Sequence, residues 1–105
     1  MIELNKENFE NEVTNYSDKP VFIDFWGDKC ETCMSLMPDV HKLEEKYGEK
    51  VKFCGLNTNK NRRLAISQKV LGLPTMAIYK NGEKVETLAP DKVSIASIEE
   101  MLKKY

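Results

Sequence analysis

The chain has 105 residues, of which 31% are charged and 41% hydrophobic, and its formal net charge is −1. This length has room for one hydrophobic core, so we expect a single domain over residues 1–105. The near-neutral charge gives no indication of a nucleic-acid partner, and no apolar run is long enough to cross a bilayer. Neither a secretory signal nor the cysteine density of a disulfide scaffold is visible, so we expect a cytoplasmic protein.

The first predicted elements are a short edge strand and a helix. Ile2 and Leu4 alternate with polar residues, as in a strand with one covered face. Asn5 is a suitable N-cap for a helix over residues 6–16, because its side chain can accept hydrogen bonds from free backbone N–H groups. The apolar residues at helical spacing in that segment are Phe9, Val13 and Tyr16.

The next strand and helix flank a pair of cysteines. The near-continuous apolar run over residues 21–26 is typical of a strand covered on both faces. A long helix is predicted over residues 31–47, ending at Gly48. Its buried stripe consists of Leu36, Val40, Leu43 and Tyr47. Pro38 lies inside this helix and removes one backbone donor, so we expect a kink there.

The second half of the chain continues the alternation. The predicted elements are strands over residues 51–56, 75–79 and 83–89 and helices over residues 62–71 and 94–104. Gly72 is expected to end the first of these helices. Asn81-Gly82 is the strongest short signal for a hairpin and predicts an antiparallel pair. Helices between the other strands imply parallel crossovers, so we expect an α/β fold with a mixed sheet.

Cys30 and Cys33 are separated by two residues and lie between the apolar strand and the long helix. If Cys30 ends the loop and Cys33 lies in the first helical turn, the two sulfurs can form a reversible disulfide. A helix N-terminus carries partial positive charge and free N–H groups, which favour a thiolate. A thiol of lowered pKa beside a second thiol is the requirement for disulfide exchange.

The alternative for these two cysteines is half of a zinc or iron–sulfur site. Such sites need about four ligands. His41 would lie roughly 12 Å along the helix from Cys33, and Cys54 lies within a predicted strand, where a small core residue is the simpler interpretation. The chain has no second Cys-x-x-Cys, so we expect no metal site.

Features spread over essentially the whole chain resemble the thioredoxin family. Asp24-Phe25-Trp26 precedes the cysteines at the family's spacing, and Pro38 falls where the family kinks its helix. Leu73-Pro74-Thr75 resembles the loop that faces the disulfide and carries a cis proline, and Tyr79-Lys80-Asn81-Gly82 resembles the hairpin. The resemblance implies the thioredoxin fold, a central mixed five-stranded sheet flanked by four helices.

The active-site segment departs from the family's common pattern. Glu31-Thr32 stands where the family commonly has Gly-Pro, Lys29 where it has tryptophan, and Gly55 where it has a lysine near the aspartate. A carboxylate beside Cys30 disfavours its thiolate, whereas an ammonium group favours it. We therefore expect Glu31 and Thr32 to tune the redox properties.

The resemblance also implies roles for three residues. Cys30 would be the exposed nucleophile, Cys33 the buried resolving thiol, and Asp24 the group that exchanges a proton with Cys33. Aspartate is rarely buried without a reason, and desolvation would raise the pKa of Asp24 toward neutrality. The alternative for Asp24 is an ordinary surface or turn-capping residue.

The function implied is protein-disulfide reduction through Cys30 and Cys33, with recycling by a separate flavoprotein of the thioredoxin-reductase type. The surface expected to bind disulfide-containing clients consists of Trp26, Gly27, Lys29, Leu73 and Pro74. Two alternatives remain, a dedicated electron donor to one reductase enzyme and a binding or assembly subunit without redox turnover. For the leading interpretation we expect a monomer with no bound cofactor.

Overall fold

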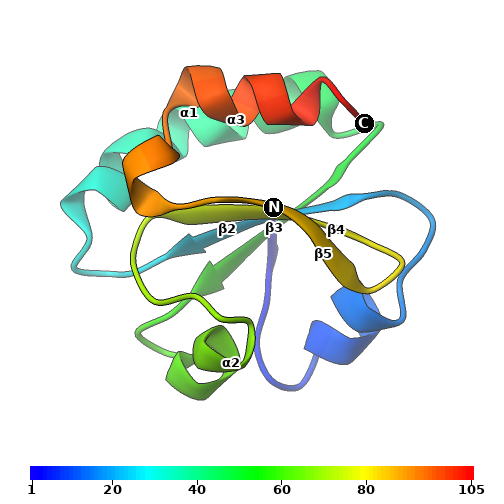
Figure 1. The fold of residues 1–105 in the computed structure, drawn as a ribbon, viewed down its shortest axis with the longest axis horizontal. Coiled ribbons are helices and arrows are strands. Elements are labelled where there is room, and N and C mark those ends of the chain that lie inside the picture. Colours follow the sequence, from blue (N-terminus) through cyan, green and yellow to red (C-terminus); the bar gives the residue numbers. More distant parts are fainter.

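The computed structural model describes all 105 residues and contains a twisted five-stranded sheet with helices on both faces (Figure 1). The strands are β1 (Ile2–Glu3), β2 (Val21–Trp26), β3 (Lys52–Asn57), β4 (Thr75–Lys80) and β5 (Glu83–Leu88), in the order β1-β3-β2-β4-β5. β3 pairs in parallel with β1 and β2, whereas β4 is antiparallel to β2 and β5. The predicted mixed sheet is confirmed, but the parallel crossover expected through the helix before β4 is wrong, because β4 runs antiparallel to β2.

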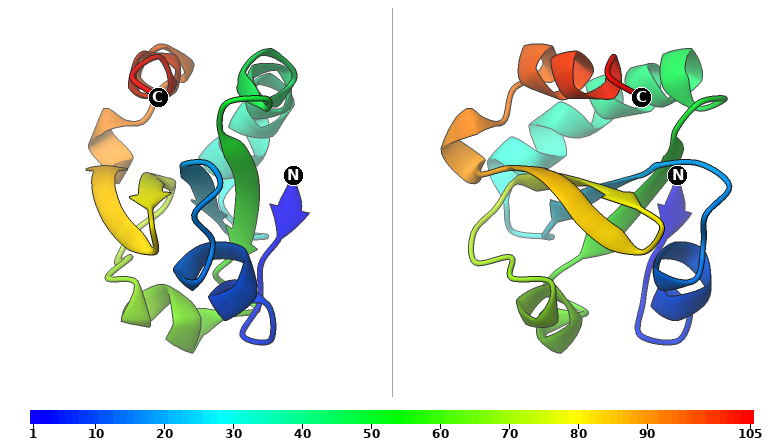
Figure 2. Two further views of the ribbon diagram at one scale, coloured as in Figure 1. Left: turned by 90° about the vertical axis from the view of Figure 1, so that its right-hand side faces the viewer. Right: turned by 45° about the vertical axis from the view of Figure 1, so that its right-hand side comes forward.

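The helices divide between the two faces of the sheet. They are η1 (Glu10–Thr14, a π-helix), α1 (Glu31–Tyr47), α2 (Arg62–Ser67) and α3 (Ile95–Leu102), with a 3₁₀ turn η2 at Pro90–Lys92. α1 and α3 lie side by side over one face, and η1 and α2 lie on the other (Figures 1 and 2). The predicted arrangement of a sheet flanked by four helices is confirmed.

Each face of the sheet supports its own hydrophobic core, because successive strand side chains point to opposite sides. In β2, Phe22 packs in the core under α1 and α3, while Ile23 and Phe25 pack in the core with η1 and α2. The rings of Phe22 and Phe53 lie with their centroids 4.9 Å apart. β2 is therefore covered on both faces, as its apolar run predicts.

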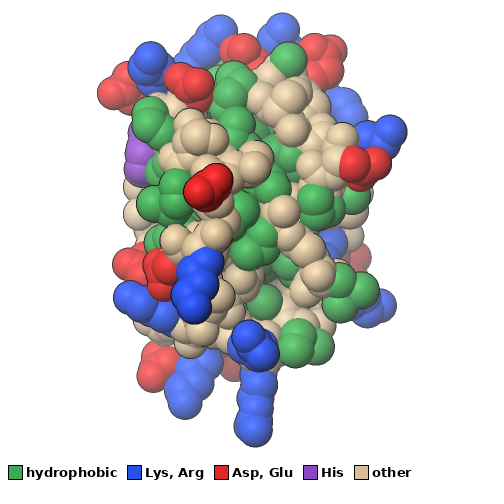
Figure 3. All heavy atoms as spheres, turned by 90° about the vertical axis from the view of Figure 1, so that its left-hand side faces the viewer, with side chains coloured by type: hydrophobic (Ala, Val, Ile, Leu, Met, Phe, Trp, Pro, Cys, Tyr) green, Lys and Arg blue, Asp and Glu red, His purple; other side chains and the backbone are tan.

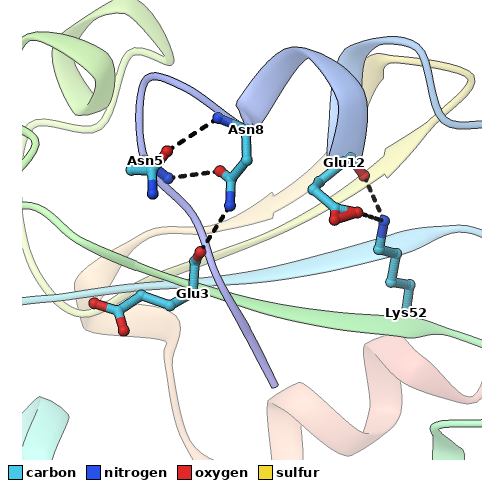
Figure 4. A network of polar contacts seen from close by, with 5 residues as sticks. All are labelled: Glu3, Asn5, Asn8, Glu12 and Lys52. Carbon is cyan, nitrogen blue, oxygen red and sulfur yellow. Dashed lines mark hydrogen bonds and ion pairs between the residues drawn. The ribbon is translucent and has the colours of Figure 1, made fainter.

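The helix expected over residues 6–16 is regular only within η1. Asn5 Oδ1 accepts the backbone N–H of Asn8 at 3.0 Å, and Asn8 Oδ1 accepts that of Asn5 at 2.8 Å (Figure 4). This reciprocal pair closes a turn ahead of η1, whose own N-cap residue is Phe9 and has no side-chain cap, so the prediction of Asn5 as the helix cap is wrong. Lys52 of β3 then ties the helix to the sheet, since its Nζ donates to the carbonyl and the carboxylate of Glu12, each at 2.9 Å.

The prediction of a helix over residues 62–71 is wrong at its C-terminal end, because α2 stops four residues earlier. Lys69 adopts a left-handed conformation with φ of 64°. The Val70 N–H then donates to the Ala65 carbonyl at 3.1 Å, which closes the helix in a Schellman motif. Glycine is the usual residue at that left-handed position, so a lysine there gave no signal in the sequence.

The hairpin between β4 and β5 turns at Asn81 and Gly82, whose φ angles are 52° and 82°. Two positive φ angles are what a two-residue hairpin turn requires. A Cβ on Gly82 would lie only 2.2 Å from the Thr14 carbonyl oxygen. The turn therefore packs closely against the end of η1, and the predicted hairpin is confirmed.

Candidate active site

Cys30 and Cys33 form a disulfide at the N-terminus of α1, with their Cα atoms 5.2 Å apart. Cys30 is the N-cap residue of this helix and Cys33 lies in its first turn. The Cys33 backbone N–H donates to Cys30 Sγ at 3.1 Å. One of the free N–H groups of the helix start is thus placed to stabilise a thiolate at Cys30 after reduction.

The two sulfurs differ in their access to solvent. Cys30 is partly exposed, whereas only 1% of Cys33 is accessible. Glu31 and Thr32 lie exposed between them, and Lys29 is exposed directly before Cys30. A partner disulfide can therefore reach Cys30 but not Cys33.

Asp24 is buried within β2, where only 1% of the residue is accessible and Oδ1 has no hydrogen-bond partner. Burial raises the pKa of Asp24 to about 7. The alternation along β2 places Asp24 on the same face as Phe22, which is the face that α1 covers. Its neighbour on β3 is Gly55, so that strand places no cation beside the carboxyl. The Asp24 carboxyl can therefore hold a titratable proton on the face of the sheet that α1 covers.

The loop before β4 lies against the cysteine loop. A Cβ on Gly27 would lie 3.0 Å from Leu73 Cδ1, so these two segments are in close contact. The peptide bond between Leu73 and Pro74 is cis, as the resemblance implies. Neither the N–H nor the carbonyl of Leu73 has a hydrogen-bond partner in the chain. The predicted surface residues Gly27 and Leu73 are thus brought together beside the disulfide.

The sequence matches the family model described as thioredoxin over residues 1–104. The chain belongs to the thioredoxin family. A thioredoxin of Acetoanaerobium sticklandii is 51% identical over 108 residues, covering all of this chain and 99% of that protein. A thioredoxin of Peptoclostridium acidaminophilum is 44% identical over 105 residues, covering all of this chain and 94% of that protein. A thioredoxin of Porphyra purpurea is 35% identical over 98 residues, covering 93% of this chain and 90% of that protein.

Family membership and the site geometry together define the reaction class. The cysteine pair of this thioredoxin-family chain lies at disulfide distance, at a helix start that favours a thiolate. The chain is therefore a thiol–disulfide oxidoreductase, of the protein-disulfide reductase type. No three side chains of His, Cys, Asp or Glu lie close enough together to hold a metal ion, and no helix has the length and apolar composition to span a membrane.

Two asparagines that brace the cysteine loop, Asn57 and Asn59, were not predicted as site residues. Asn59 Oδ1 accepts the Asp28 backbone N–H at 2.7 Å, and Asn57 Nδ2 donates to the Asp28 carboxylate at 3.0 Å. A Cβ on Gly27 would lie 2.6 Å from Asn59 Oδ1. These amides therefore fix the segment that leads into Cys30. The only sequence feature that could have indicated them is the pair of amide side chains at the end of β3, the strand next to β2, which leads into the cysteine loop.

The remaining predicted surface residues differ in accessibility. Trp26 is partly buried and lines a groove of about 250 Å³ together with Met34 and Met37 of α1. Gly27 and Pro74 are buried, so they shape the surface more than they present side chains to it. Figure 3 shows this face of the molecule, on which hydrophobic side chains gather around the centre.

Proposed function

We propose that Cys30 attacks a disulfide of a client protein and that Cys33 completes the exchange. The Cys30 thiolate forms a bond to one client sulfur, and the other client sulfur leaves as a thiolate that takes up a proton. Cys33 then attacks Cys30 Sγ and releases the second client sulfur. The client gains two electrons and two protons, and the chain is left with the Cys30–Cys33 disulfide. The difference in exposure between the two sulfurs is the observation that carries this assignment.

Asp24 is proposed as the base that receives the proton of Cys33. The Cys33 thiol must lose its proton before it attacks, and the surrounding core excludes most water. A carboxyl whose burial raises its pKa to about 7 can accept and return a proton at neutral pH. Its position in β2, on the face that α1 covers, supports this role.

The client is proposed to bind as an extended segment beside Leu73. The free N–H and carbonyl of Leu73 can pair with a client backbone in the manner of strand addition. Trp26 and Lys29, on the segment that leads into Cys30, are proposed to extend this client surface, while Gly27 and Pro74 allow the close approach. Glu31 and Thr32, which separate the two cysteines, are proposed to set the redox potential through the charge and packing next to Cys30.

The oxidised chain needs an electron source, and we propose a separate flavoprotein reductase of the thioredoxin-reductase type. Within this cycle the chain would act as a single domain and a monomer in the reducing cytoplasm, where a reversible dithiol is maintained. The chain would carry no bound cofactor of its own. Disulfide-containing proteins would be its clients.

Insulin reduction with dithiothreitol as electron source tests the proposal. The wild type should accelerate the reaction, and Cys30→Ser should remove the acceleration without loss of the folded far-UV circular dichroism spectrum. Cys33→Ser should instead accumulate a mixed disulfide with the client. A wild type no faster than dithiothreitol alone would point to a binding subunit without turnover.

A dedicated electron donor gives a different result in a second assay. Such a protein would be oxidised rapidly by one reductase enzyme and only slowly by a panel of unrelated disulfide proteins. A general reductase would act on the panel broadly. The equilibrium potential of the Cys30/Cys33 pair against glutathione would then decide whether it serves as reductant or oxidant.

A further inference from the structure

The segment between Glu49 and Glu83 contains seven Lys and Arg residues and no Asp or Glu, in a chain whose net charge is −1. Lys60, Arg62 and Arg63 gather at the start of α2. None of these three side chains makes a hydrogen bond or ion pair within the chain, and all are exposed. Figure 3 shows basic side chains projecting from the lower edge of the active-site face, the edge at which α2 lies in Figure 1. This edge is therefore available to negatively charged partners.

A groove of about 200 Å³ runs along α2 to the loop before β4. Its floor is apolar, with Ala65 and Val70 from the core. Its walls include Ile66 and Leu71, of which 57% and 92% are exposed. Two aliphatic side chains so exposed beside buried apolar residues suit contact with an apolar side chain of a bound segment.

The groove shares residues with the active-site surface and has one charged residue in its lining. Leu73, whose free backbone groups are proposed to bind the client, lines it together with Asn59, which braces the cysteine loop. Arg62 is the only charged residue in its lining. Glu7 lines a neighbouring hollow together with Arg62, but no ion pair joins the two, and Asp28 of the cysteine loop already accepts a hydrogen bond from Asn57. The guanidinium group of Arg62 therefore has five donors and no partner from the chain.

We propose that this groove is a specificity subsite for clients whose disulfide cysteine is flanked on one side by an aliphatic residue and then an acidic residue. The aliphatic side chain would pack between Ile66 and Leu71, and the carboxylate would pair with Arg62. Continuity with Leu73 and the charge of Arg62 argue for this occupant. The inference rests on the proposed function, since it describes which clients the same cysteine pair reduces.

Disulfide-linked peptides of matched length provide the test. The peptides carry Leu–Glu, Leu–Lys, Ser–Glu or Ser–Lys beside the cysteine, and each is made with the pair N-terminal or C-terminal to the cysteine. We expect kcat/KM for the Leu–Glu peptide to be about tenfold higher than for the Ser–Lys peptide in one of the two directions. About 0.5 M NaCl should weaken this preference, because the ion pair is exposed to screening.

Variants then assign the preference to the groove. Arg62→Gln should reduce it to about threefold, and Arg62→Glu should favour a Leu–Lys peptide over Leu–Glu. Leu71→Ser should reduce the preference for Leu over Ser. The matched controls are Arg63→Gln, which does not line the groove, and Val85→Ser, which alters an exposed aliphatic residue on β5. Both controls should behave as the wild type.

Hydroxyethyl disulfide, a small neutral substrate, distinguishes failure of the proposed subsite from failure of the proposed disulfide reduction. All variants should reduce it at the wild-type rate. Normal turnover of this substrate with equal kcat/KM for all peptides would overturn the subsite while leaving the proposed function intact. A preference that survives Arg62→Glu, or one that Arg63→Gln abolishes equally, would also overturn it. A wild type that reduces neither the small disulfide nor any peptide would overturn both.

Discussion

The start of α1 and the middle of β3 hold the same side chain in opposite environments. Cys30 caps the helix, is partly exposed, and accepts a hydrogen bond from the Cys33 N–H. Cys54 in β3 is fully buried, and burial raises the pKa of its thiol to about 12. A helix start thus stabilises negative charge on sulfur, whereas a covered strand opposes it.

The two regions are also separated by the sheet itself. Cys54 packs with the core under η1 and α2, whereas α1 covers the opposite face. The alternation of side chains along β3 makes this separation, because Gly55 rather than Cys54 faces Asp24 across the strands. Three cysteines therefore divide into a reactive pair and an inert core residue by position alone.

Removing one sulfur from each region should have different effects on activity. Cys30→Ser should reduce the rate of disulfide reduction to that of the uncatalysed exchange, because no attacking sulfur remains accessible. Cys54→Ala should keep the wild-type kcat/KM and lose only about 1–2 kcal/mol of unfolding free energy. Insulin reduction and urea titration measure the two effects. Loss of activity in folded Cys54→Ala would place the core thiol in the mechanism.

Alkylation of the reduced chain compares the same sulfurs without mutation. With a pKa of about 12, only about one in ten thousand Cys54 thiols would be ionised at about pH 8, even before access is considered. Iodoacetamide should therefore modify Cys30 at least about a thousandfold faster than Cys54. Peptide mapping after timed quenching gives both rates, and urea should expose Cys54 to full labelling. Equal native rates would contradict the assigned environments.

Burial raises the pKa of the Asp24 carboxyl, as it raises the pKa of the Cys54 thiol. Its pKa rises from an ordinary 3.8 to about 7 in the folded chain. At pH values between 3.8 and about 7, Asp24 is protonated in the folded chain but ionised in the unfolded chain. The contribution of Asp24 to the unfolding free energy is therefore largest below about pH 4. This contribution declines as the pH rises to about 7, and the whole change is about 4 kcal/mol.

The expected result is a loss of unfolding free energy in the oxidised wild type between about pH 4 and pH 7 that Asp24→Asn does not share. Urea titrations of both proteins at several pH values give this difference directly. Asp18→Asn is the matched control, since Asp18 is exposed and should leave the wild-type profile unchanged. Parallel profiles for the wild type and Asp24→Asn would show that Asp24 titrates as an ordinary carboxyl.

The parts of the fold that the sequence predicted correctly rest on local patterns. The apolar run of β2 and the Asn-Gly turn each specify a structure through adjacent residues. The end of α2 was predicted wrongly because Lys69 takes a left-handed conformation that sequence assigns to glycine or asparagine. Tertiary contacts of Val70 with the core, not a local signal, fix that boundary.

The candidate site shows the same division. The cysteine pair and Asp24 stand out because their residue types and spacing are unusual for a strand and a helix start. The hydrogen bonds that brace the cysteine loop cannot be recognised in the sequence, because Asn59 and Asp28 are 31 positions apart. Only the parallel pairing of β2 and β3 brings their ends together. Sequence spacing therefore finds the reacting groups more readily than the groups that position them.

The two regions also differ in how the backbone is held. Backbone hydrogen bonds to neighbouring strands hold β3, whereas the amide side chains of Asn57 and Asn59 hold the segment before Cys30. Asn59→Ala removes the acceptor for the Asp28 N–H and should cost about 1 kcal/mol of unfolding free energy. Asn11→Ala, at an exposed position in η1, is the matched control and should cost less than about 0.5 kcal/mol. Urea titration of the oxidised proteins measures both changes.

Gly27→Ala tests the same brace from the other side. Its Cβ would lie 2.6 Å from Asn59 Oδ1 and 3.0 Å from Leu73 Cδ1, so the amide must move and the substitution should destabilise the loop by about 1–2 kcal/mol. In an Asn59→Ala background the first clash is absent, and the cost should fall by about 1 kcal/mol. Such coupling in a double-mutant cycle would locate the brace at these two residues. Additive effects would mean that the loop before Cys30 is positioned by its own conformation and that the two amides only accompany it.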